Sequence, residues 1–275
     1  MKSQQHDPIY SQISQVKDAV AEVLEHAKKL GATAAEAAMS STSGLSVSTR
    51  MGEVETIEFN QDGGLGISVY VGNNKGSAST ADLNPKTLRT VVEKAIDIAK
   101  FTSDDPFNGI ADKELLEFAP KDLDLYHPWD VSPEQGIELC HAAEQAALNA
   151  DERIVNSDGA SFSSHQGLRV YGNSHGLIAG FPRTRHSIST MVIGKEGEHM
   201  QRDSAYTVAR DQGGLNDAAA VGLEAATETL AKLNSQKLGT MKVPVIFRAD
   251  IANSLFGHLV SDIFGGALYR QSSFF

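Results

Sequence analysis

Apolar residues follow two kinds of spacing along this chain, one typical of helices and one typical of strands. Apolar residues recur every three or four positions over about 9–30, the spacing of an amphipathic helix, and Gly31 then supplies a C-terminal stop. From 34 to 82 apolar and polar residues alternate instead, which indicates strands. Turn signals interrupt this region at Ser43-Gly44, Met51-Gly52, 61–64 and 72–74. The pattern predicts a meander of about four or five short antiparallel strands.

A second helix is expected directly after this meander. Asn84 suits the N-cap, Pro85 suits the first helical position, and apolar residues continue at helical spacing to Ala99. The segment 101–135 is rich in Asp and Pro, so it is interpreted as a connector.

The order of elements then repeats. Ser132 and Pro133 start a helix that runs to about Asn149, turn-punctuated strand material fills 152–209, and an Ala-rich helix covers about 215–233. Helix, meander and helix therefore occur twice, although the halves share no evident identity.

The last predicted elements are a strand at 243–247 and a helix over 248–262. We therefore expect an α+β fold with two domains, 1–120 and 121–275. The chain ends "SSFF" without a polar tail, so a β-rich C-terminal domain is expected to be incomplete and the truncated form poorly soluble or unstable.

Composition limits the classes of function. The chain has 275 residues, 41% of them hydrophobic, with a net charge of -11. An acidic balance argues against nucleic acid or an anionic membrane as partner. The basic cluster "FPRTRH" (181–186) is interpreted as a solvated loop. No signal peptide and no run of about 20 apolar residues is present, so a cytoplasmic protein is expected.

Cys140 is the single cysteine, so no disulfide can form within the chain. It lies at helical spacing with Ile137 and Ala143, which favours a buried helix cysteine over a nucleophile. The histidines outside the helix 248–262 show no metal-ligand spacing, and no chemistry is assigned to them.

The helix 248–262 carries candidate chemistry, because Ser254, His258 and Asp262 share one stripe at i, i+4 and i+8. A Ser-His-Asp relay lacks a tight turn and an oxyanion hole behind the serine. A metal pair of His258 and Asp262 lacks the further ligand that catalytic zinc needs. The pattern alone favours a core or interface helix with one hydrogen-bonded histidine.

The glycine-rich run "DGGLGISVYVG" (62–72) leads into a strand, unlike a phosphate-binding loop. A tight hairpin turn is favoured. The functional alternative is a sheet edge within 63–80 to which an extended peptide adds as a strand, with candidate contacts at Gly64, Gly66, Ser68 and Tyr70.

Four segments resemble the TldD/PmbA family, the paired subunits of a bacterial metallopeptidase once called modulators of DNA gyrase. The resemblance covers nearly the whole chain, and its segments are 48–85, 151–164, 170–181 and 243–274. The last segment resembles the region in which zinc-bearing TldD-type subunits carry a helical H-E-x-x-x-H motif.

Two of the three chemical positions of that motif are replaced here. Asn253 stands at the first histidine, Ser254 at the glutamate, and His258 at the last histidine. The resemblance therefore implies a PmbA (TldE)-type subunit that binds no metal itself and pairs with a TldD-type subunit bearing zinc. The pair is expected to cleave unstructured peptides, including leader peptides of microcin-type antibiotics. Two alternatives stay open: a non-proteolytic topoisomerase modulator, and a self-sufficient hydrolase using Ser254.

Overall fold

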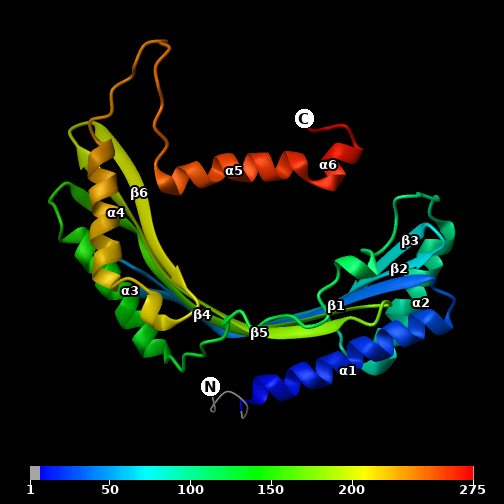
Figure 1. The fold of residues 1–275 in the computed structure, drawn as a ribbon. Helices are drawn as coiled ribbons and strands as arrows, with labels where there is room; N and C mark the ends of the chain where they lie inside the picture. The colour runs from blue at the N-terminus through cyan, green and yellow to red at the C-terminus, as the bar shows by residue number, and fades with distance from the viewer. Residues whose placement is uncertain (1–6, 275) are drawn as a thin grey trace. The chain divides into compact units, whose positions relative to one another are not determined.

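The computed structural model describes residues 7–274, which form two compact units, 7–234 and 235–274. Unit 1 contains two successive sets of helix, three antiparallel strands and helix (Figure 1). The first set is α1 (Pro8–Lys29), β1 (Ala34–Arg50), β2 (Glu53–Val71), β3 (Asn74–Thr80) and α2 (Pro85–Phe101). The second set is α3 (Pro133–Leu148), β4 (Ile154–Asn173), β5 (Ile178–Glu196), β6 (His199–Ala209) and α4 (Ala218–Lys232). The expected α+β fold and its repeated order are confirmed.

All strands belong to one six-stranded antiparallel sheet with the order β3-β2-β1-β4-β5-β6. The two sets join where β1 pairs with β4, from Glu36↔Asn173 to Thr49↔Ala160. The domain boundary expected near residue 120 lies inside unit 1, in the connector between α2 and α3, and stays a prediction.

The four long helices cover the convex face of this curved sheet (Figure 1). Odd-numbered residues of β1 point to that face: Ala35, Ala37 and Met39 pack with α1 and α2, while Leu45 and Val47 pack beneath α3. Further along, α4 packs on β5 and β6 around Val192. The core is thus a single layer of helices on one face of the sheet.

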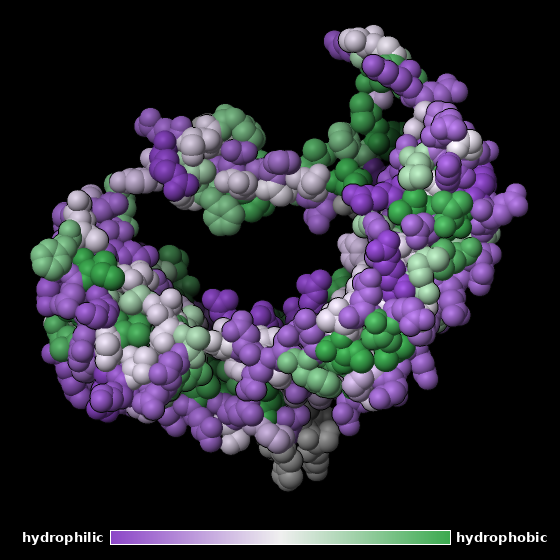
Figure 2. Space-filling view, turned by 180° about the vertical axis from the view of Figure 1, so that it is seen from behind, coloured by the Kyte–Doolittle hydropathy of each residue, from purple (hydrophilic) through white to green (hydrophobic). Residues whose placement is uncertain are grey.

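The concave face of the sheet is polar along its central strands, and the surface in Figure 2 mixes hydrophilic and hydrophobic residues. The register places serines opposite one another across three central strands, as in the row of Ser46, Ser163 and Ser187. The Oγ atoms of Ser163 and Ser187 lie 2.8 Å apart. Such serine pairs satisfy their own hydrogen bonds at the centre of this face. Phe181, Tyr206 and Val208 are exposed on the same face.

Capping residues fix the helix starts. The Asn84 side chain accepts from Lys86 N at 3.0 Å, and Ser132 forms a capping box with Gln135. Both were predicted from the sequence, and both precede a proline at the start of the helix.

The strands are longer and fewer than predicted, because two of the expected turns lie inside strands. Gly44 pairs with His165 in the middle of β1, where a Cβ would lie 2.3 Å from the carbonyl oxygen of Ser164. This glycine therefore allows two backbones to approach closely rather than reverse the chain. The 61–64 signal lies within β2, whereas Met51-Gly52 is a true turn with φ of 51° and 80°.

Two further expectations are wrong. The cluster 181–186 is not a loop but part of β5, where Arg183 and Arg185 point to the concave face. The run 243–247 forms no strand. The described part of unit 2 contains only helices, α5 (Ala249–Ile263) and α6 (Gly265–Tyr269). The expected incompleteness of a β-rich C-terminal domain stays a prediction.

No helix among residues 7–274 combines the length and apolar character that crossing a membrane requires.

Candidate functional site

The three residues that the resemblance places at the metal motif lie on α5 with their side chains exposed. Asn253, Ser254 and His258 are all on the surface of this helix. The Ser254 hydroxyl donates to the backbone oxygen of Ile251 at 2.7 Å, so it is engaged with its own helix turn rather than with His258. A serine held in this way is not activated by a neighbouring base.

The donor set at this motif does not fit catalytic zinc. Zinc in proteins takes imidazole, thiolate or carboxylate ligands, and Asn253 offers only a neutral amide oxygen. Ser254 has no group that could act as the general base. Among the described residues, no three His, Cys, Asp or Glu side chains come together as a metal site.

The four candidate peptide contacts, Gly64, Gly66, Ser68 and Tyr70, lie on one face of β2. From Leu65 to Tyr70 this strand pairs with β1 on one side and β3 on the other. A peptide could not add as a strand beside Gly66, Ser68 and Tyr70, because both edges of their backbone are occupied. Gly64 lies one residue beyond the last pair of β2 with β3, Leu65↔Thr80.

Tyr70 instead belongs to a hydrogen-bonded cluster that the sequence did not reveal. Its hydroxyl donates to Glu36 Oε1 at 3.3 Å, and the Tyr171 hydroxyl donates to Glu36 Oε2 at 3.0 Å. Burial, and then the charge of Glu36, raise the pKa of Tyr70 to about 12. One carboxylate thus links side chains from β1, β2 and β4, because the register places all three on the concave face.

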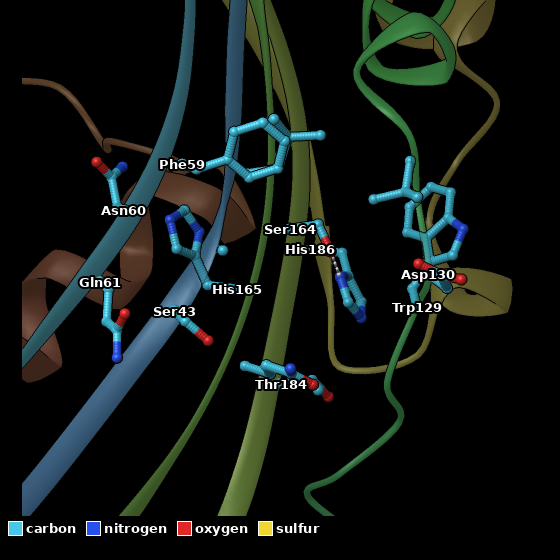
Figure 3. A pocket seen from close by; sticks show the side chains of 14 residues that line it. Ser43, Phe59, Asn60, Gln61, Trp129, Asp130, Ser164, His165, Thr184 and His186 are labelled. Atoms are coloured by element: carbon cyan, nitrogen blue, oxygen red, sulfur yellow. Dashed lines mark hydrogen bonds between the residues drawn. The ribbon is translucent and has the colours of Figure 1, made fainter.

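The convex face carries a second site at the centre of the sheet, built around buried His186 (Figure 3). Its Nε2 lies 3.1 Å from the backbone oxygen of His127, and its Nδ1 lies 2.9 Å from Ser164 Oγ. A carbonyl oxygen can only accept, so Nε2 carries a proton, and in the neutral imidazole Nδ1 then accepts from the serine hydroxyl. The Trp129 ring meets the imidazole edge-on, with centroids 5.4 Å apart.

A cavity of about 360 Å³ lies over this pair. Apolar walls come from Leu45, Phe59 and Trp129, and polar groups come from Gln61 and Asp130. Figure 3 shows Phe59, Asn60 and Gln61 on one side of the cavity, with Trp129 and Asp130 across from them. The chemistry available is recognition of a side chain by apolar walls and a few polar groups.

The Ser164–His186 pair does not resemble a nucleophile and its base. Ser164 is only 7% exposed, and no carboxylate orients the histidine, whose second nitrogen is held by a backbone carbonyl. The pair instead fastens the connector to the sheet, because His127 belongs to the segment that leads into α3. Sequence spacing gave no signal for it, since the two residues meet only through the β4–β5 register.

Comparison with known proteins finds two successive family domains, which correspond to the two repeated sets of the sheet. A model of the PmbA/TldA metallopeptidase domain 1 matches residues 35–99, and a model of the central domain of the same metallopeptidases matches 126–233. The chain belongs to the PmbA/TldD family.

Curated relatives and solved structures support the family assignment. Metalloprotease PmbA of Escherichia coli O157:H7 is 55% identical over 240 residues, which cover 87% of this chain and 53% of that protein. The PmbA homolog of Haemophilus influenzae is 47% identical over 264 residues, covering 96% and 58%. The chain thus spans about half the length of these relatives.

Two solved structures share the fold. A modulator of DNA gyrase from Bacteroides thetaiotaomicron superposes with a TM-score of 0.86 at 27% identity, covering 94% of this chain and 59% of that one. TldE from Thermococcus kodakarensis gives 0.61 at 16% identity, covering 77% and 47%, and so is similar in fold alone.

Proposed function

We propose that this chain is the non-catalytic, PmbA/TldE-type subunit of a zinc metallopeptidase that cleaves unstructured peptides. The observation that carries the proposal is the donor set on α5, where Asn253, Ser254 and His258 offer one imidazole, one amide and one hydroxyl. Zinc and the general base would then come from a TldD-type partner, and this chain would bind no metal.

The family assignment supports the peptidase class, since relatives at 55% and 47% identity are called metalloproteases. The exposure of Asn253, Ser254 and His258 on α5 supports a surface role for that helix, and the described residues hold no group of three metal-ligating side chains. Unstructured peptides, including leader peptides of the microcin kind, are the proposed substrates.

The test is hydrolysis of an unstructured peptide by this chain alone, by a TldD-type partner alone and by the two together. We expect activity only in the mixture, abolished by a chelator, with zinc recovered from the partner and not from this chain. Stoichiometric zinc and peptide hydrolysis in this chain alone would overturn the proposal.

Two variants sharpen this test. Ser254→Ala and His258→Ala should both leave the hydrolysis rate of the mixture unchanged within about twofold, because neither side chain does chemistry. Loss of activity in Ser254→Ala would favour the self-sufficient hydrolase. Salt-sensitive DNA binding by the chain, without peptidase activity in the mixture, would favour the topoisomerase modulator.

A further inference from the structure

We infer that the outer edge of β2 over Glu53–Asp62 docks a strand of the zinc-bearing partner subunit, apolar on one face and basic on the other. The identity of the partner rests on the proposed function. The docking edge itself rests on the pairing, exposure and charge of these residues.

Pairing leaves one side of this segment open. On its inner side β2 pairs with β1 down to Arg50↔Glu53. On its outer side β3 pairs with β2 only as far as Leu65↔Thr80. Among the described residues, no strand covers the outer edge from Asp62 back to Glu53, so its outward backbone groups are available to another strand.

Exposure shows that neither face of this segment is covered. All residues from Glu53 to Asp62 are exposed, although the β1 residues opposite them include buried Leu45 and Val47. Ile57 pairs with Val47 and Phe59 pairs with Leu45, so these side chains stand on the helix-covered face but beyond the helices. Phe59 is 73% exposed and Ile57 45%.

This edge lacks two of the residue types that protect sheet edges, proline and lysine. A ten-residue strand at about 3.3 Å per residue runs for roughly 30 Å, and 53–62 contains no proline and no lysine. The opposite end of the first meander is different, because β3 has only 7 residues and carries Lys75. A long open edge that also exposes apolar side chains such as Ile57 and Phe59 favours association with another strand.

Charge identifies the kind of partner. The segment carries four carboxylates and no basic residue: Glu53, Glu55, Glu58 and Asp62. Pairing with the same edge of a second copy would bring two such acidic rows together, and like charges across a strand pair destabilise it. The complementary strand therefore carries Lys or Arg opposite the concave-facing acids and apolar residues opposite Ile57 and Phe59.

A subunit fits this edge better than a passing substrate. Apolar side chains that stay exposed between turnovers would favour aggregation, whereas a subunit keeps them covered. The cavity beside the edge also suits a fixed anchor. Phe59 and Gln61 line it together with Trp129 and Asp130, so a side chain from a docked strand can enter it (Figure 3). In strand addition, such pockets supply specificity.

Hydrogen exchange tests the inference on the whole chain, alone and with a TldD-type partner. We expect amides within 53–62 to exchange at least about tenfold more slowly in the complex, and amides of 65–71 to change little. A complex that forms without protecting 53–62 would overturn the inference and leave the proposed function intact. Failure to form any complex would overturn the partner role and this inference together. Protection in the chain alone that rises with concentration would overturn it in favour of self-pairing.

A matched pair of variants tests the same edge by affinity. The double variant Ile57→Lys, Phe59→Lys should weaken the complex about tenfold or more. It removes apolar area that the docked strand would bury and puts two charges in its place. Leu223→Lys, a 50% exposed leucine on α4, is the control and should bind normally. Glu58→Lys should weaken the complex most at low salt. Equal binding by all of these variants, with unchanged melting temperatures, would overturn the inference.

Discussion

The Oε1 atom of Glu144 lies 2.8 Å from the backbone nitrogen of Met51, at the tip of the β1–β2 hairpin. The other carboxylate oxygen accepts from Gly52 N at 3.0 Å. Glu144 is fully buried in α3, whereas the turn has positive φ at both positions. A helix from the second set thus holds a hairpin of the first set, and this hairpin leads directly into the exposed 53–62 edge.

Replacing this carboxylate should destabilise the protein. Glu144→Ala removes two charge-assisted hydrogen bonds and leaves a small cavity, so we expect a loss of about 2–3 kcal/mol in the free energy of unfolding. Glu144→Gln keeps the shape and one acceptor, so its loss should be smaller, about 1 kcal/mol. Denaturant unfolding of both variants is the measurement. Equal stabilities for Ala and wild type would show that the turn does not depend on this contact.

The Cys140 thiol should be inert in the folded protein. It is buried in α3, and burial, followed by the charge of Glu144, raises its pKa to about 12. Because the thiolate is the reactive form, we expect a thiol reagent at pH 8 to react more than about a hundredfold faster with the unfolded chain. Comparable rates in buffer and in denaturant would contradict this buried placement.

Tyr70 should make stability depend on pH in the alkaline range. Its pKa of about 12 in the folded state lies above the ordinary value of 10.0, so folding favours the neutral phenol. The stability that this group contributes is complete below about pH 10 and is lost as the pH rises towards 12. We expect Tyr70→Phe to flatten the decline in unfolding free energy between these values.

The same substitution should cost about 1 kcal/mol at pH 8, because the hydrogen bond to Glu36 is removed. Tyr206→Phe is the control, since that tyrosine is 69% exposed on β6. An identical alkaline profile for Tyr70→Phe and the wild type would be the contrary result.

Helix packing should be sensitive at Gly222. A Cβ at this position would lie 2.0 Å from the backbone oxygen of Ala143, so Gly222→Ala forces α4 away from α3. We expect a loss of about 2 kcal/mol or more in the free energy of unfolding. Gly66→Ala is the matched control, because nothing lies within 4 Å of its Cβ, and its stability should be unchanged or slightly higher. Thermal melts of both variants distinguish a packing effect from a general effect of replacing glycine.

Helices were well predicted because their signals are local. The Asn84 and Ser132 caps and the following prolines stand within one turn of the elements that they begin. The burial of Cys140 also followed from helical spacing alone.

Strand number could not be predicted, because a glycine in a strand and a glycine in a turn look the same in sequence. Gly44 lies within β1 because β4 passes close to it, and β4 is more than a hundred positions away in the chain. The 181–186 cluster was misassigned for a similar reason: alternation of Arg and small residues suits an exposed loop as well as a strand with one polar face.

The candidate site, like the fold, has one part that local sequence predicts and another that depends on strand pairing. The helix that carries Asn253 and Ser254 was predicted from local spacing, whereas their assignment to motif positions came from the resemblance and stays a prediction. The Glu36 cluster and the cavity near His186 depend on register between distant strands, so they become visible only once the sheet is assembled.

The pairing of β1 with β4 also has a consequence for biosynthesis. β1 ends at Arg50, and β4 begins at Ile154, roughly a hundred residues later. At about 5–20 residues per second, the ribosome needs roughly 5–20 s to make that stretch. During this interval the first meander has been made, and the edge of β1 that later pairs with β4 is still open. The outer edge of β2 over 53–62, on the opposite side of the β1–β2 pair, is open as well. Newly made chains thus pass through a stage with two unpaired edges, when chaperones have the most to protect.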